Sequence, residues 1–278
     1  MTKKLIVNAD DYGHTAGVSR GIREAHLNGL VTSTTAMMNR PFVVEALKLA
    51  KENCPRLGIG VHLCLTAGKP LLPPEMVPSL VNEEGFFFHE PEFASRLGII
   101  NINEVRAEWR AQIEKFMNLV GHAPDHLDSH HHTSYFSQIL FESMLALAAE
   151  FQCRVRRPFG EDSEYGPDGL SQSDLVTLMK SFAEKTPKPL TTKGFFGRFY
   201  DEGVSVATLK GILQEVADNP NLDSFEIMCH PAYVDDELMQ ISSYNRQRGL
   251  ERAVLQNEEV VKFARSNLNM INFSELVD

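Results

Sequence analysis

The stretch KLIVNADDYGHTAGVSRGIREAHLNGLVTSTTAMM, residues 4–38, decides the fold class of this chain. Residues 4–9 are mostly apolar and predict a buried strand. Residues 15–28 predict a helix that ends at Gly29, and residues 31–38, rich in β-branched side chains, predict a second strand. Since strand, helix and strand follow one another directly, the segment predicts a βα unit with parallel strands.

The same alternation continues along the chain. Further strands are predicted at residues 57–65, 126–131, 154–157, 194–200, 224–229 and 270–273, and helices at residues 41–52, 105–120, 136–151, 171–185, 204–218 and after Asp235. No segment has the composition of an interdomain linker, and no internal repeat is visible. We therefore expect an α/β fold in which residues 1–278 form a single (β/α)-barrel-like domain, with either a regular or a distorted barrel. A doubly wound open sheet is the alternative.

Composition restricts the function classes. The chain has 278 residues, of which 43% are hydrophobic and 23% charged, and this balance is typical of a globular protein. Its 27 Lys and Arg residues against 37 Asp and Glu residues give a formal net charge of −10, which repels nucleic acids and anionic membranes. No apolar run approaches the ~18 residues needed to cross a bilayer. We expect a cytoplasmic protein with no nucleic-acid or membrane partner, whose widely spaced cysteines are reduced and buried: Cys54, Cys64, Cys153 and Cys229.

The first strand ends in two adjacent carboxylates, Asp10 and Asp11, followed by Gly13. In parallel α/β folds the chemistry lies at the carboxyl ends of the strands. Side chains alternate along a strand, so both carboxylates reach one site only if the chain already turns there. The alternative for a single Asp here is a helix cap or an Asx turn.

Histidines lie at the ends of three other predicted strands. His62 lies in an apolar run, where a lone histidine is more often a hydrogen-bonded core residue. Residues 130–132 are three consecutive histidines after Asp128, and burying them without partners is costly. A solvated histidine loop is the alternative for this run. His230 is followed by Pro231, which ends the strand.

Together these residue types indicate metal-assisted hydrolysis. One carboxylate and two neutral imidazoles form a site for a divalent cation such as Zn²⁺, Co²⁺, Mn²⁺ or Ni²⁺. A second carboxylate can act as base and a separate histidine as acid. A phosphoesterase is the nearest alternative enzyme, although no glycine-rich loop or group of converging cations is evident. A noncatalytic metal- or sugar-binding protein is the alternative from another class.

Five motifs carry a family resemblance: NADDYG at 8–13, VTSTTA at 31–36, GIGVH at 58–62, HLDSHHH at 126–132 and CHP at 229–231. In this order they resemble the motifs of the YdjC-like carbohydrate deacetylases, a family that includes the chitooligosaccharide deacetylases. The resemblance extends from Leu5 to about Tyr233. It implies a (β/α)-barrel-like fold, one divalent metal ion (Mg²⁺ or Zn²⁺) and hydrolysis of N-acetyl groups on N-acetylglucosamine-containing oligosaccharides, with release of acetate.

The resemblance also implies a role for each of five residues. Asp11, His62 and His130 would hold the metal ion. Asp10 would be the general base and His230 the general acid. The choice of His130 rests on the resemblance, since spacing does not rank the three histidines.

Other assignments stay open at this point. Family members often continue with Val-His after the three histidines, where this chain has Thr133 and Ser134, and many have glycine where Ala232 stands. The acetylated sugar, the metal and the oligomeric state, with a homodimer as one option, are therefore not determined. Arg156 or Arg157 would orient Asp10 or bind substrate, or else form a solvated strand end.

One connection is too long for an ordinary turn. Residues 66–103 follow the third predicted strand and contain several prolines and the aromatic run Phe86-Phe87-Phe88. We expect a long inserted loop that closes over the sugar, with aromatic faces stacked on the pyranose ring. The alternative is that these aromatics anchor the loop to the barrel.

Overall fold

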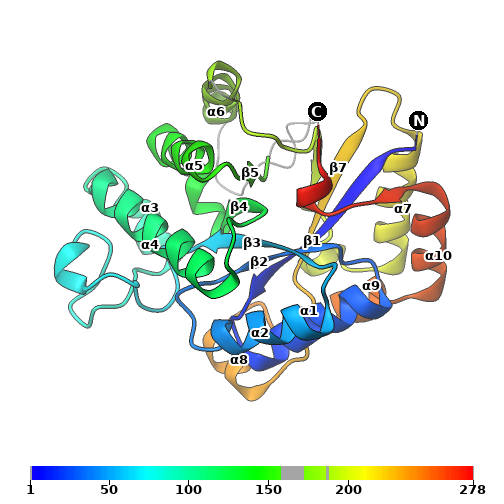
Figure 1. Cartoon of the computed structure of the whole chain (residues 1–278), viewed down its shortest axis with the longest axis horizontal. Coiled ribbons are helices and arrows are strands. Elements are labelled where there is room, and N and C mark those ends of the chain that lie inside the picture. The colour runs from blue at the N-terminus through cyan, green and yellow to red at the C-terminus, as the bar shows by residue number, and fades with distance from the viewer. Residues whose placement is uncertain (1, 158–171, 186–187, 278) are drawn as a thin grey trace.

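The computed structural model describes residues 2–157, 172–185 and 188–277, in which eight parallel strands form one curled sheet covered by helices (Figure 1). The strands are β1 (Lys4–Tyr12), β2 (Ser33–Ala36), β3 (Gly58–Leu63), β4 (His126–Ser129), β5 (Arg154–Val155), β6 (Gly194–Phe196), β7 (Ser224–Cys229) and β8 (Asn269–Met270). Their order is β5-β4-β3-β2-β1-β7-β6, and β8 pairs with the start of β1. The predicted α/β fold, a distorted (β/α)-barrel-like domain, is confirmed.

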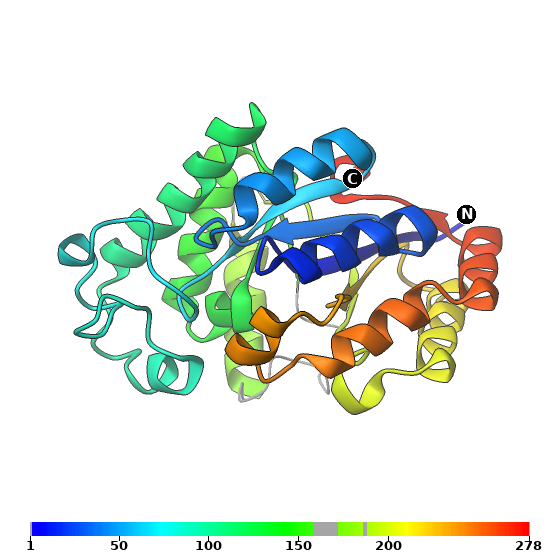
Figure 2. The ribbon, with the colours of Figure 1, turned by 90° about the horizontal axis from the view of Figure 1, so that it is seen from below.

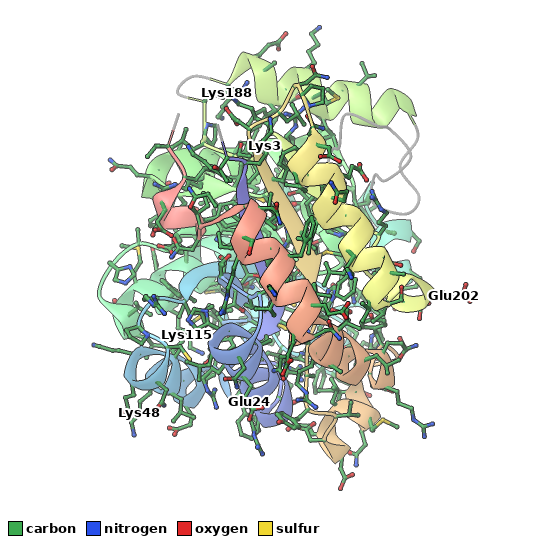
Figure 3. All side chains as sticks on the ribbon, turned by 90° about the vertical axis from the view of Figure 1, so that its right-hand side faces the viewer. Lys3, Glu24, Lys48, Lys115, Lys188 and Glu202 are labelled. Carbon is green, nitrogen blue, oxygen red and sulfur yellow. The ribbon has the colours of Figure 1, made fainter. Side chains whose placement is uncertain are left out.

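Ten helices surround this sheet in the described ranges. They are α1 (Ala16–Asn28), α2 (Val43–Asn53), α3 (Glu90–Ser95), α4 (Ile102–Val120), α5 (Gln138–Phe151), α6 (Gln172–Glu184), α7 (Val206–Asp218), α8 (Asp236–Ile241), α9 (Arg246–Leu255) and α10 (Glu258–Asn267). Figure 3 shows α7 and α10 side by side over the outer face of the sheet, with Lys48 and Glu24 on the outer surface. Among the described residues, no helix combines the length and the apolar character needed to span a bilayer.

Local sequence explains most element boundaries. Thr15 caps α1 by accepting a hydrogen bond from the backbone N–H of Val18. Ser137 caps α5 in the same way, so this helix begins at Gln138 and not at the predicted residue 136. The predicted helix 171–185 appears as α6, although residue 171 lies outside the described residues. All four cysteines are free and buried, as predicted.

The C-terminal segment covers the amino ends of the strands. The ring of Phe273 stacks on His126 at a centroid distance of 3.6 Å. Phe273 also packs with Ile6 in a small apolar cluster. Arg154 on β5 donates hydrogen bonds to the carbonyl oxygens of Ser274 and Leu276. This end of the sheet is thereby filled, and the carboxyl ends of the strands are left for the site.

The inserted segment 66–103 extends away from the sheet but is ordered and anchored (Figure 2). It contains α3 and the short 3-10 helix Pro74–Met76. The buried carboxylate of Glu108 on α4 accepts hydrogen bonds from the backbone N–H groups of Leu71 and Leu72. Phe87 and Phe88 are buried, so the expectation that they offer stacking faces to a sugar is wrong, and they serve as anchors; Phe86 is 41% exposed.

Candidate metal and catalytic site

Asp10 and Asp11 face one buried site because β1 is irregular at this point. The pairing of β1 with β2 shifts between Ala9 and Tyr12, and Asp11 has a φ of 71°. Aspartate enters this left-handed region more readily than most residues. In a regular strand the two carboxylates would point to opposite faces. The bulge therefore meets the condition that the sequence pattern set for a shared site.

Asp11, His62 and His130 form a compact group whose ligand atoms all lie within 4.8 Å of one another. Asp11 Oδ1 lies 3.3 Å from His62 Nε2 and 3.0 Å from His130 Nδ1. Within the described part of the chain this buried oxygen accepts no hydrogen bond of normal geometry. A buried carboxylate oxygen without a donor, facing two imidazole nitrogens, is a donor set that fits a divalent cation.

Asp128 holds His62 in the orientation that a metal ligand needs. Its Oδ1 lies 2.7 Å from His62 Nδ1, so Nε2 is the nitrogen that faces Asp11. Burial opposes a charged imidazole, but Asp128 and Asp11 together raise the pKa of His62 to about 10. A cation bound at Nε2 would thus displace a proton.

The backbone separates the three consecutive histidines. His130 follows β4 directly and reaches Asp11. His131 and His132 have φ values of 53° and 54°, which carry the chain away from the strand direction. His131 Nδ1 lies 3.0 Å from Thr66 Oγ1, and the His132 ring packs between aromatic side chains. Only His130 of the three belongs to the group around Asp11 in the described residues.

Arg156 is fully buried inside the curl of the sheet and contacts three carboxylates. Its Nη1 and Nη2 donate to the two oxygens of Asp10, each over 2.7 Å. Nε donates to Glu226 over 2.7 Å, and Nη1 lies 2.9 Å from Asp128. The solvated strand end considered for Arg156 is therefore wrong, because the residue lies beside Asp10.

The Arg156 guanidinium lowers the pKa of Asp10 more effectively than that of Glu226. Burial by itself would raise the pKa of Asp10, but the charge of Arg156 and its hydrogen bonds hold that pKa well below the usual range. Burial raises the pKa of Glu226 to about 7, and Arg156 opposes this only in part. Asp10 is consequently a carboxylate at neutral pH, whereas Glu226 is ionised only in part there.

His230 lies at the end of β7, opposite the metal ligands across Asp10. Its Nε2 is 3.9 Å from Asp10 Oδ2, and its side chain is 12% exposed. Its backbone N–H donates to the buried carboxylate of Glu251, whose Oε1 lies 3.7 Å from His230 Nδ1. The ring edge faces Tyr244. All five residues chosen from the sequence thus converge on one space.

A family profile described as YdjC-like protein matches residues 4–266. This chain belongs to the YdjC-like family. The resemblance inferred from the five motifs is confirmed, and the match includes every residue of the site described above.

The alignments with two relatives and one solved structure cover nearly the whole of this family member. A carbohydrate deacetylase of Enterococcus faecalis is 40% identical over 260 residues, which are 93% of this chain and 92% of that protein. A chitooligosaccharide deacetylase of Proteus mirabilis is 36% identical over 257 residues, 92% of this chain and 91% of that protein. A crystal structure from E. faecalis, of a protein proposed to be a cellobiose-phosphate cleavage protein, superimposes with a TM-score of 0.88 at 37% identity and covers both chains fully.

Two charged residues of this YdjC-like site did not emerge from the sequence. Arg248 and Glu251 are both on α9, and their side chains are buried. Arg248 Nη2 donates to Asp11 Oδ2 over 2.7 Å, and Glu251 accepts from His230 and from the hydroxyl of Tyr244. Oppositely charged residues three positions apart on a helix are common on surfaces. The sequence pattern of α9 therefore does not distinguish the buried residues Arg248 and Glu251 from an exposed ion pair.

Proposed function

We propose that this chain is a metal-dependent deacetylase that removes N-acetyl groups from N-acetylglucosamine-containing, chitin-type oligosaccharides and releases acetate. The observation that carries the proposal is the position of the anionic Asp10 beside the metal-type group of Asp11, His62 and His130. The names of full-length relatives at 35–40% identity support the deacetylase chemistry and the sugar substrate. We further propose that the protein works in the cytoplasm, as one domain over residues 1–278.

Asp11, His62 and His130 would hold one divalent ion, Mg²⁺ or Zn²⁺. When bound, this ion would polarise the acetamide carbonyl and lower the pKa of a water molecule. The ligand set of two imidazoles and one carboxylate, with the Asp128 carboxylate behind His62, is typical of hydrolytic metal sites. Two imidazole ligands favour zinc over magnesium, which prefers oxygen donors.

Asp10 would accept the proton of the attacking water. Arg156 keeps this carboxylate ionised and fixes both of its oxygens, so its position does not depend on the substrate. His230 would donate a proton to the departing amine, which leaves as the free amino group of the sugar. Glu251 and Tyr244 hold the backbone and ring of His230 in place.

The test is acetate release by metal-reconstituted protein from a panel of N-acetylated mono- and oligosaccharides. A phosphorylated disaccharide belongs in the panel, because cleavage of cellobiose phosphate was proposed for the E. faecalis protein of known structure. Asp10→Asn should lose roughly 10²- to 10⁴-fold in activity while it keeps the metal. Loss of the metal in Asp10→Asn and its retention in Asp11→Asn would show that the two roles are exchanged.

Failure to release acetate from every sugar would contradict the proposed reaction. Release of another product would indicate a different hydrolase on the same barrel. Sugar binding without turnover would indicate a noncatalytic family member. Because a protein that only binds metal has no use for Asp10 and His230 in their present positions, we expect turnover.

A further inference from the structure

Arg248 is a buried cation that reaches Asp11 from a helix far along the chain. It lies on α9, which packs beside α1 (Figure 2), and is 4% exposed. Its Nη2 donates to Asp11 Oδ2 over 2.7 Å, and its Nε donates to the carbonyl oxygen of Tyr244 over 2.8 Å. The second bond fixes the plane of the guanidinium and thereby the direction of the first.

Stability alone does not explain this contact. Burying an arginine carries a large desolvation penalty, which its ion pair only partly offsets. Arg248 Nη1 is buried as well and makes no hydrogen bond among the residues that the structure describes. A charged side chain held at such a cost beside a proposed metal ligand points to a role in the site.

The two oxygens of Asp11 are used differently. Oδ2 is taken by Arg248, whereas Oδ1 faces His62 Nε2 and His130 Nδ1. A carboxylate that is free to rotate would present either oxygen, or both, to a cation. With Oδ2 held, only Oδ1 is available on the side of the imidazoles.

We propose that Arg248 is a positioning residue that fixes the rotation of the Asp11 carboxylate and limits it to one oxygen toward the metal ion. This inference rests on the proposed metal site. One-oxygen binding leaves more of the coordination shell open for water and substrate, as hydrolysis requires. Glu251, three residues further on α9, supports His230, so the same face of one helix holds both sides of the site.

Charge and geometry make opposite predictions for the loss of Arg248. If the guanidinium acted only through its charge, its removal would relieve repulsion and tighten metal binding. If it positions Asp11, its removal weakens metal binding by about 10- to 100-fold, the usual effect of losing a residue that orients a metal ligand. Lysine keeps the charge but has one ammonium group, which cannot bond to Asp11 and Tyr244 in the same fixed plane.

The experiment is calorimetric titration of the metal-free full-length protein with Zn²⁺ for the wild type, Arg248→Met, Arg248→Lys and the exposed control Arg246→Met on the same helix. We expect Arg248→Met to bind Zn²⁺ about 10- to 100-fold more weakly, Arg248→Lys to fall between it and the wild type, and Arg246→Met to match the wild type. Thermal unfolding of each metal-free variant shows whether it folds. If Arg248→Met does not fold, weaker binding by a folded Arg248→Lys carries the test.

Two results would overturn the inference, and they can be told apart. Unchanged or tighter Zn²⁺ binding in the Arg248 variants would remove the positioning role and leave the proposed metal site intact. Absence of stoichiometric Zn²⁺ binding in the wild type would remove the proposed metal site itself, and the positioning role with it.

Discussion

Arg156 donates to both carboxylate oxygens of Asp10, from Nη1 to Oδ2 and from Nη2 to Oδ1, over 2.7 Å in each case. Three strands separate β5 from β1 in the sheet, so this contact crosses the interior of the curl. Such a two-pronged bond determines the position and the plane of the carboxylate. The pair therefore links the curvature of the sheet to the orientation of the proposed base.

Two replacements of Arg156 should distinguish its effect on kcat from its effect on the stability of the fold. Arg156→Lys keeps the charge but loses the two-pronged bond, and we expect kcat for acetate release to fall by about 100-fold, as for a misplaced catalytic group. Arg156→Met removes the one guanidinium that contacts all three buried carboxylates and should lower the free energy of unfolding by about 3–5 kcal/mol in urea denaturation. Arg154→Lys, on β5 two residues before Arg156 and directed to the C-terminal segment, is the control with normal kcat. A normal kcat in Arg156→Lys would contradict the positioning of Asp10.

The three consecutive histidines should differ sharply in metal binding. We expect His130→Ala to lose stoichiometric metal, because among these three described histidines only His130 has a ring nitrogen beside Asp11. His131→Ala and His132→Ala are the matched controls and should retain metal, as measured by elemental analysis after dialysis. Full metal content in His130→Ala would transfer the ligand role to a neighbouring histidine.

Glu226 should make stability depend on pH. Burial raises its pKa in the folded protein to about 7, against an ordinary value of 4.5. The folded state thus binds a proton that the unfolded chain releases, so the stabilisation is complete below about pH 4.5 and is lost as the pH rises through about 7. Glu226→Gln keeps an oxygen acceptor for Arg156 but does not titrate.

The measurement for Glu226 is urea denaturation of both proteins at a series of pH values. The difference in the free energy of unfolding, wild type minus Glu226→Gln, should decrease between about pH 5 and about pH 8. Parallel pH profiles would show that Glu226 has the same pKa in the folded and unfolded states.

Two neighbouring aromatic residues of the inserted segment, Phe86 and Phe87, should contribute differently to stability. Phe87 is 3% exposed, and Phe87→Ala should lower the free energy of unfolding by about 3–5 kcal/mol. Phe86 lies under the ammonium group of Lys69 at the surface, so Phe86→Ala should leave stability nearly unchanged. If Phe86 contacts the sugar, its variant raises KM for oligosaccharides. A normal KM in Phe86→Ala would show that Phe86 does not stack on the sugar.

Sequence patterns alone are enough to predict the fold class and the residues most suited to chemistry. Apolar strands alternate with amphipathic helices, and each pattern follows from local geometry and burial, so both can be recognised without contacts. Polar residues at strand ends then indicate the site, because parallel strands bring their carboxyl ends to one edge of the sheet. This reasoning identifies four of the site residues from the sequence: Asp10, Asp11, His62 and His230.

The contacts between these residues depend on how the folded chain packs. The bulge at Asp11 and the left-handed turn at His131 depend on packing around the strand ends, and no pattern in the sequence reports them. The partners Arg156 and Arg248 reach the site from segments far along the chain. An arginine on a helix or at a strand end has the same local signature whether it meets water or a buried carboxylate. Its role is set by what the fold places opposite it, because burial strengthens an ion pair that solvent would screen.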